Sequence, residues 1–347
     1  MRSAPHPGGI RPSVSVPSSI SFVAVNAIKG AASNRDRSKD PDELWEDAKF
    51  LAALLIVTKS KTDATWEDQG RELLTLFLAC VGGLALEQRS MTQVLDLMAG
   101  INLDETFEDI LQEDADYPST MRRTAKKYAD IRAASEKQWA GITSAANQHL
   151  AVWEGSKVEK VTAASDWTPM DFRKSPAPTL YLQVPPNAID TYAPLLRVII
   201  AQHVNELMRE EPNADAPPIL FMLDEMPQLG MMEPIKKALT VGRSYKIQLW
   251  MFAQNLGQLQ EVYGKETAAT MVESCGVEMY MNPRQETADR LSKALGTRED
   301  VLSGKTVPVV TPQALTGPEW KDDILVFATG EKPLRLKKAF FHEMQSE

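Results

Sequence analysis

The chain has 347 residues, a net charge of −9, two cysteines and four histidines. At roughly 100–200 residues per domain, this length predicts two domains, or one α/β domain with an insertion. A hydrophobic content of 43% and a charged content of 24% exclude a wholly disordered chain. The few, widely spaced cysteines and histidines exclude a disulfide scaffold and do not suggest a metal site. The longest apolar run, residues 73–86, is shorter than the roughly 20 residues that cross a bilayer, which predicts a cytoplasmic location for the chain as given.

Charge is unevenly distributed along the chain. Residues 1–40 carry a net charge of +4, and the other 307 residues carry −13. Because proteins that coat DNA non-specifically are usually basic, the overall charge does not predict such a protein. Any contact with nucleic acid is therefore expected from a local patch or a channel.

The start of the chain is predicted to be disordered and then to contain one strand. Residues 1–20 are rich in Pro, Ser and Gly, which is typical of disorder, and the apolar run Ser21–Ile28 is typical of a strand. Asp40 and Pro41 suit the N-cap and the first position of a helix. This helix is expected over residues 43–58.

The next segment is predicted to be helical throughout. One helix is expected from Trp66 to about Leu84, and residues 85–150 show apolar side chains at spacings of three and four. Residues 104–116 contain seven acids and no base, whereas residues 121–137 carry a net +4. A solvated helix face explains such a pattern. The alternative is a contact surface for nucleic acid or an acidic partner, formed by Arg122, Arg123, Lys126 and Lys127.

From residue 178 onward, short apolar strands alternate with helices. Strands are expected at 179–184, 219–223, 247–252, 277–281 and 324–328, and helices at 192–209, 232–243, 257–262, 266–273 and 285–295. Near-continuous apolar strands in this alternation predict an α/β fold. Its mostly parallel sheet is expected to be covered by helices on both faces.

Two acids end one of the expected strands. Asp224 and Glu225 directly follow the apolar residues 219–223. Ligands of open α/β sheets bind at the carboxyl ends of the strands. In nucleotide hydrolases of the P-loop class, an Asp at this position holds Mg²⁺, and an adjacent Glu is placed to polarise the attacking water. Strand ends also carry acids by chance, so spacing alone leaves both explanations open.

Two further side chains suit a phosphate site. Gln254 lies just beyond the strand expected at 247–252, where its amide could sense a γ-phosphate or orient water. Arg243 lies at the end of the preceding helix. An Arg there is a favourable partner of the helix dipole, or it is an arginine finger that reaches a phosphate on a neighbouring subunit.

A phosphate-binding loop is the remaining part of such a site. It requires G-x-x-x-x-G-K-[ST] followed by a helix. The only Gly-Lys-[Ser/Thr] triplet is Gly304-Lys305-Thr306, with Glu299 five residues before it and a strand-like stretch, 307–310, after it. We therefore predict that the triplet does not bind phosphate, and the sequence contains no Walker A motif.

These motifs together resemble the coupling proteins of type IV secretion, the TraG/TraD-type conjugative DNA-transfer ATPases. The similarity covers roughly residues 20–345 and is most specific from 219 to 296. The matching segments are Trp66 with Arg71–Leu74, Ser165–Trp167, Leu180–Leu182, Phe221–Gly230, Ala238-Leu239, Gly242-Arg243, Ala253–Leu259, Val262–Gly264, Thr287-Ala288, Leu291-Ser292, Leu295-Gly296 and Gly330–Pro333.

The resemblance implies a fold and a domain organisation. A RecA-like nucleotide-binding domain would comprise residues 21–84 and 166–347, without a P-loop, and an inserted all-α domain would comprise residues 85–165. The all-α domain of this family takes part in substrate recognition, which makes residues 121–137 a candidate contact patch. This chain contains neither the family's N-terminal transmembrane helices nor its Walker A motif, and so resembles a C-terminal portion.

The resemblance also implies an activity, cofactors and partners. The family hydrolyses ATP with Mg²⁺, is hexameric when active, and is anchored on the cytoplasmic face of the bacterial inner membrane. It recruits a relaxosome, a relaxase–DNA complex or a secreted effector and passes it to the inner-membrane components of the secretion channel. Asp224 matches the Mg²⁺-associated acid, Glu225 its catalytic neighbour, Gln254 the sensor glutamine and Arg243 the trans-acting arginine.

Two alternatives remain beside a coupling-protein motor. The chain could be a non-catalytic recognition or scaffold module of the secretion machinery, with the helical segment docking the substrate. It could also be a septal or sporulation-type DNA pump of the same superfamily. The all-α insertion before Asp224 disfavours the pump.

Overall fold

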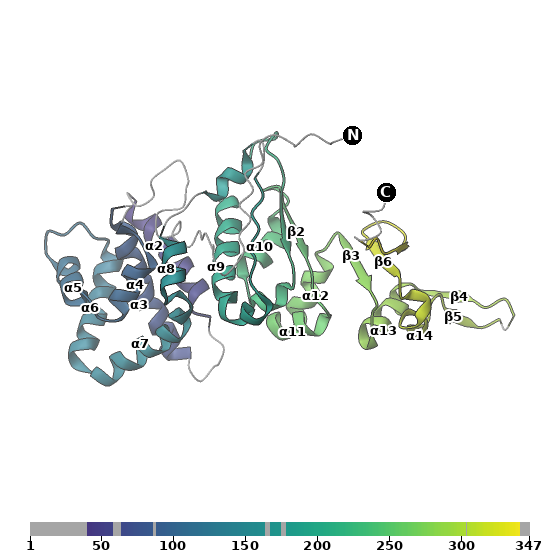
Figure 1. Ribbon diagram of the computed structural model, residues 1–347, viewed down its shortest axis with the longest axis horizontal. Helices are drawn as coiled ribbons and strands as arrows, with labels where there is room; N and C mark the ends of the chain where they lie inside the picture. Colours follow the sequence, from purple (N-terminus) through teal and green to yellow (C-terminus); the bar gives the residue numbers. More distant parts are fainter. Residues whose placement is uncertain are drawn as a thin grey trace. The chain divides into compact units, whose positions relative to one another are not determined.

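The computed structural model describes residues 40–57, 64–85, 88–163, 167–174, 178–302 and 304–340. The chain divides into two compact units, residues 1–251 and 252–347 (Figure 1). The disorder expected for residues 1–20 and the strand expected at Ser21–Ile28 lie outside the described residues. Over the described part, no helix is both long enough and apolar enough to span a bilayer.

Helices make up most of the first unit. The first of them, α2 (Pro41–Leu55), begins as predicted, because the Asp40 carboxylate accepts hydrogen bonds from the backbone N–H groups of Asp42 (3.1 Å) and Glu43 (3.3 Å). The following α-helices are α3 (Ala64–Gly83), α4 (Met91–Met98), α5 (Leu103–Leu111), α6 (Ser119–Ala134), α7 (Glu136–Leu150), α8 (Ser156–Thr162), α9 (Ile189–Leu207) and α10 (Glu233–Val241). The predicted helical character of residues 85–150 is confirmed over its described residues, with turns between the four helices.

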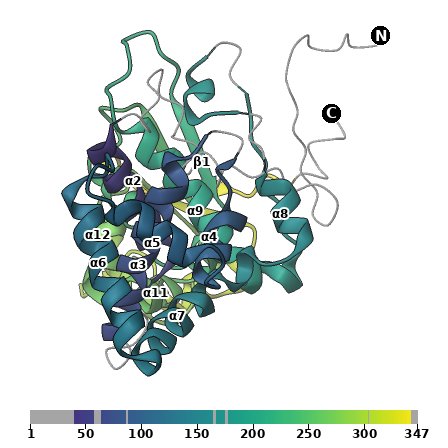
Figure 2. The same cartoon turned by 90° about the vertical axis from the view of Figure 1, so that its left-hand side faces the viewer.

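Helix α3 is the centre of the helical part, and α2, α4, α6 and α7 pack against it (Figure 2). Its apolar residues from Leu73 to Ala79 are almost fully buried. Helix α7 approaches α3 closely at Gly70, where an added Cβ would lie 3.2 Å from the Cβ of Ala146. Helix α6 is fastened to α3 by Tyr128, whose buried hydroxyl donates to the carbonyl of Gln69 at 2.7 Å and contacts a carboxylate oxygen of Glu72 at 3.0 Å.

Removing the Tyr128 hydroxyl is expected to loosen α6. The Tyr128→Phe variant keeps the ring but loses both hydrogen bonds, so its free energy of unfolding should fall by about 1–2 kcal/mol in urea titrations. Tyr117→Phe is a matched control because Tyr117 is 39% exposed. That control should change the stability by less than about 0.5 kcal/mol. Equal stability of the two variants would contradict a fastening role for Tyr128.

A short segment ties α9 to the start of the sheet. The indole N–H of Trp167 donates to Nε2 of His203 on α9 at 3.1 Å, while Nδ1–H of His203 donates to the carbonyl of Ile199 at 2.8 Å. The ring of Phe172 packs edge-on against His203, 5.7 Å between centroids. Arg173 then donates to the carbonyls of Pro217 (3.0 Å) and Tyr245, which precede the two strands.

The first unit contains a two-stranded parallel sheet. Strand β1 (Ile219–Leu223) pairs with β2 (Ile247–Met251) in the register Ile219↔Ile247 to Leu223↔Met251, which confirms both predicted strands and their parallel pairing. The side chains of Ile219, Leu223 and Ile247 are buried on one face. On the other face Leu220, Met222 and Trp250 are 48%, 58% and 45% exposed. The predicted coverage of both faces by helices is therefore not seen for these two strands among the described residues.

The second unit has a sheet of a different kind. Strand β6 (Asp323–Ala328) lies between β3 (Val277–Met281) and β7 (Leu334–Lys337), and both pairings are antiparallel. Helices α13 (Gln285–Ala294) and α14 (Pro312–Leu315) contribute Ala288, Leu291 and Leu315 to the core on one face of this sheet. Its other elements are α11 (Leu256–Tyr263), α12 (Lys265–Glu273) and the hairpin of β4 (Thr297–Glu299) and β5 (Thr306–Pro308). The prediction of one mostly parallel sheet is therefore corrected. Among the described residues, β1 and β2 pair in parallel, and the other strand pairings are antiparallel.

The strand predicted at residues 179–184 is not formed among the described residues. Only Tyr181 in this stretch takes part in β pairing, as an isolated bridge. Pro185 and Pro186 follow at once and have no N–H to donate, so a ladder has no room to continue.

Candidate functional site

The acidic pair lies at the carboxyl end of β1, in the turn that leads to the short 3₁₀ helix η6 (Met226–Leu229). Asp224 is exposed and Glu225 is half-buried. Glu225 has φ 49° and ψ 44°, in the left-handed region that residues other than glycine rarely adopt. Such a conformation costs of order 1–3 kcal/mol and persists where the surroundings impose it.

One carboxylate oxygen of Glu225 is buried and has no hydrogen-bond partner among the described residues. A buried acceptor without a partner costs about 1–3 kcal/mol, so this oxygen marks a place where a donor or a cation would be stabilising. The described residues contain no group of three or more His, Cys, Asp or Glu side chains arranged to hold a metal. Mg²⁺ suits the two adjacent carboxylates nevertheless, because it is commonly held by one or two of them together with phosphate oxygens and water.

The far end of the acidic turn is fixed by α9. The guanidinium of Arg197 donates to the carbonyl of Leu229 at 3.4 Å. Gly230 follows with φ 76°, and a Cβ at this position would lie 3.1 Å from the same guanidinium nitrogen. Sequence reasoning missed Arg197. The available signal was a lone charged residue within the apolar stretch of residues 193–201.

Arg243 lies at the other end of the strands. It follows Gly242, the C-cap of α10, and precedes β2, whereas Asp224 follows β1. Since β1 and β2 are parallel and in register, the two residues are separated by the length of the strands, about 16 Å. Gly242 makes this turn possible, because an added Cβ would come within 2.3 Å of the carbonyl oxygen of Ala238. The structure does not bring Arg243 to the acidic pair of its own chain.

Gln254 lies in the second unit, three residues after the end of β2. Its side chain is exposed, and its backbone N–H donates to the side-chain oxygen of Gln258 at 3.3 Å. Asn255 caps α11 by accepting from the backbone N–H of Gln258 at 3.0 Å. The local geometry therefore holds the backbone at Gln254 and leaves its amide side chain accessible.

The Gly304-Lys305-Thr306 triplet lies in the β4–β5 hairpin. The backbone N–H of Gly304 donates to the carbonyl of Asp300, and the N–H of Asp300 donates to the carbonyl of Lys305, both at 2.8 Å. Strand β5 follows the triplet where a phosphate loop would lead into a helix. The triplet therefore lies in a hairpin turn, and its lack of phosphate binding stays a prediction.

The fold and the acidic turn can be compared with known families. A family model described as "Type IV secretory system Conjugative DNA transfer" matches residues 36–306. The chain belongs to this conjugative DNA-transfer family. The resemblance found from the sequence is thereby confirmed.

Relatives within the conjugative DNA-transfer family have low sequence identity to this chain, but the alignments with several of them cover most of it. The chain is 27% identical over 327 residues to VirD4 of Rhizobium rhizogenes, covering 87% of this chain and 47% of that protein. It is 22% identical over 317 residues to the type IV secretion system-coupling protein VirD4 of Bartonella henselae, covering 84% and 49%. It is 28% identical over 200 residues to TraG of Escherichia coli, covering 54% and 31%. The chain spans about half the length of the VirD4 proteins.

Solved structures of the conjugative coupling protein TrwB share the fold. The unbound form has a TM-score of 0.64 and 17% identity, covering 85% of this chain and 69% of that one. A complex of TrwB with ADP and Mg²⁺ has a TM-score of 0.59, with the same identity and coverage. The chain therefore has a TrwB-like α/β fold that is mainly helical, with small sheets.

The four cations predicted on α6 differ in how they are engaged. Arg122 donates to the carbonyls of Gln112 (2.7 Å) and Ala115 (2.5 Å), so it holds the loop after α5 in place. Lys127 pairs with Glu72 at 2.5 Å. Arg123, Lys126 and Lys127 are all exposed, but Arg123 and Lys126 contact only residues of α6 itself. Arg123 donates to the hydroxyl of Ser119, and Lys126 pairs with Asp130 one turn away. Of the four, these two are the more accessible to a partner.

Proposed function

We propose that this member of the family is an ATP-dependent coupling protein that recruits a DNA–protein substrate and directs it to a type IV secretion channel. The family membership supports the coupling role. The observation that carries the nucleotide-dependent part is the acidic turn after β1, where Glu225 is held in a left-handed conformation with a buried, unpartnered oxygen. Strain and an unmet acceptor at one residue are typical of a site that is completed by a ligand.

Asp224 is the residue that would hold Mg²⁺ with bound ATP. The ion would neutralise the phosphate oxygens. Glu225, with one oxygen withheld from solvent, is placed to accept a proton from an attacking water. Gln254 is proposed to contact the γ-phosphate. Arg243, about 16 Å from the acidic pair along the strands, is proposed to act on a neighbouring subunit. ADP and Mg²⁺ in the TrwB complex support this choice of cofactors.

The finer organisation follows the same proposal. The α/β part is proposed to be a RecA-like nucleotide-binding domain and residues 85–165 its substrate-recognition domain. The partners are a relaxosome, a relaxase–DNA complex or a secreted effector, together with inner-membrane components of the secretion system. The active form is proposed to be a homo-hexamer at the cytoplasmic face of the inner membrane.

Recruitment is tested by binding of the full chain to a purified relaxase–DNA complex from a transfer system of this family, measured by surface plasmon resonance. The Arg123→Glu/Lys126→Glu variant reverses the two accessible charges on α6 and is expected to weaken binding about tenfold, equivalent to 1.4 kcal/mol. Lys157→Glu/Lys160→Glu is the matched control, since both residues are exposed on α8 of the same helical part. The control should change affinity less than about twofold.

Two results would count against this account of recruitment. Absence of binding by the unaltered chain at micromolar concentrations would oppose substrate recruitment itself. Equal weakening in the α6 and α8 variants would mean that recognition depends on overall charge, and would remove Arg123 and Lys126 from the proposed contact surface.

A further inference from the structure

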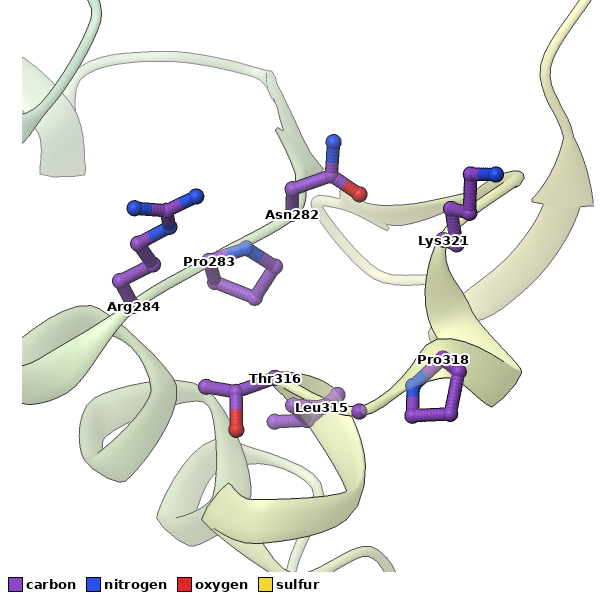
Figure 3. A pocket seen from close by; sticks show the side chains of 8 residues that line it. Asn282, Pro283, Arg284, Leu315, Thr316, Pro318 and Lys321 are labelled. Carbon is purple, nitrogen blue, oxygen red and sulfur yellow. The ribbon is translucent and has the colours of Figure 1, made fainter.

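A pocket of about 280 Å³ opens within the second unit, between two connections of its sheet (Figure 3). Asn282, Pro283 and Arg284, which join β3 to α13, form one side. Leu315, Thr316 and Lys321, from the connection of α14 to β6, form much of the other. In this view Pro283 lies between Arg284 and Asn282, and Thr316, Leu315 and Pro318 face them from the other connection.

The mouth of the pocket is cationic. The Arg284 and Lys321 side chains stand on opposite sides of it (Figure 3), and no acidic residue is among those that line it. Within the described part of the chain, neither the guanidinium of Arg284 nor the ammonium of Lys321 makes a hydrogen bond or an ion pair. Glu286 and Asp322 are close in sequence but do not line the pocket. Among the described residues, both positive charges are therefore without a partner.

Asn282 adds a directed neutral donor between the two cations. It has φ 47°, a left-handed conformation that Asn tolerates better than most residues. Its side-chain oxygen accepts a hydrogen bond from Nζ of Lys338 at 3.1 Å, which leaves the NH₂ group to donate elsewhere. Lys338 also donates to the carbonyl of Lys321, so a third cation contacts two of the residues that line the pocket.

We infer that this pocket binds a phosphate group of an incoming ligand. Its side chains offer a planar guanidinium, an ammonium and an amide donor around one cavity, and no carboxylate faces them. Arg binds phosphate through paired N–H donors, and Lys binds it as a point charge. The combination therefore fits a phosphate better than an uncharged, apolar molecule. The inference concerns the second unit and does not depend on Mg²⁺ or ATP at Asp224.

The phosphate could belong to a nucleic-acid strand or to a free ligand such as inorganic phosphate or ATP. The shared chemistry is the phosphate, and salt dependence separates the sources. A nucleic-acid strand releases condensed counterions on binding, so its affinity decreases steeply with salt. Loss of a single phosphate contact reduces the magnitude of the slope of log affinity against log salt concentration by about one. A free phosphate lacks this steep dependence.

The test uses the full chain and its Arg284→Ala/Lys321→Ala variant. Binding of a fluorescein-labelled 20-nucleotide oligo-dT is measured by anisotropy over a range of salt concentrations. Stabilisation by inorganic phosphate and by ATP is measured as the shift of the melting temperature. The matched control is Lys293→Ala/Lys332→Ala, two exposed cations of the same unit. Lys293 lies at the other end of α13, about 13 Å along the helix from Arg284.

A strand ligand predicts at least a fivefold loss of oligo-dT affinity and a smaller salt slope in the pocket variant, with less than a twofold change in the control. A free-phosphate ligand predicts that the melting-temperature shift by phosphate or ATP is lost in the pocket variant alone. Either result supports the inference. If the pocket variant and the control respond equally to all three ligands, the inference is overturned. Unaltered circular dichroism of both variants confirms that the comparison is between folded proteins.

Discussion

Acidification from pH 7 to pH 4 is expected to cost the first unit about 3 kcal/mol of stability through His203 alone. Burial lowers the pKa of His203 to about 4 from its ordinary 6.5, because the imidazole is 4% exposed and a charge there would be desolvated. The unfolded chain binds a proton as pH falls below 6.5, whereas the folded chain does not until about 4. The contribution is therefore complete above pH 6.5 and lost progressively down to pH 4, at 1.36 kcal/mol per pKa unit.

The measurement is urea unfolding of the full chain and of His203→Gln at pH 7, 6, 5 and 4.5. His203→Gln should be less stable at pH 7 by about 1–2 kcal/mol, since the bonds to Trp167 and Ile199 are altered. Its stability should then fall less steeply with pH than that of the unaltered chain, because other groups titrate equally in both. Parallel pH profiles would show that His203 is not the neutral buried group described here.

Replacing Asp224 with Ala is expected to raise the dissociation constant of Mg²⁺–ATP at least tenfold and to leave magnesium-free ATP binding unchanged. The variant removes one carboxylate that would ligate the ion, and a tenfold change corresponds to 1.4 kcal/mol. Asp224 is exposed, so the substitution leaves the core intact. Binding is measured with a fluorescent ATP analogue over a titration of Mg²⁺.

Asp215→Ala is the matched control for this prediction. Asp215 is an exposed acid that precedes β1, whereas Asp224 follows it. The Asp215→Ala substitution therefore removes the same negative charge at a position distant from the acidic turn. Its dissociation constant should stay within about twofold of the unaltered chain's. If both variants lose affinity equally, the effect is one of net charge, and Asp224 has no special position.

The sequence predicted the positions of short strands well and their pairing partners poorly. β1 and β3 have the predicted bounds, and β2 differs by one residue, because each is a mainly apolar stretch next to turn-forming residues. Pairing is a long-range property that such runs do not encode. β3 lies beside β6 in antiparallel order, and β7, a four-residue segment after Pro333, was not predicted at all.

At the acidic turn too, the sequence predicted the position of the residues but not their conformation. The position of Asp224 and Glu225 at the carboxyl end of a strand followed from the sequence, since an apolar run ends directly before them. The left-handed backbone of Glu225 and its buried oxygen did not, because neither a backbone angle nor the burial of one atom can be read from the pattern of residue types. Likewise, the basic residues of α6 were visible in the sequence, but the contact of Arg122 with the loop after α5 required the structure.

The central claim is that the turn at Asp224 and Glu225 holds a divalent ion together with ATP. Electron paramagnetic resonance of Mn²⁺, used in place of Mg²⁺, tests it most directly on the full chain. We predict that ATP causes one Mn²⁺ to be retained per chain, and that Asp224→Ala releases it whereas Asp215→Ala does not. Retention of Mn²⁺ and ATP by Asp224→Ala at the level of the unaltered chain would contradict the claim.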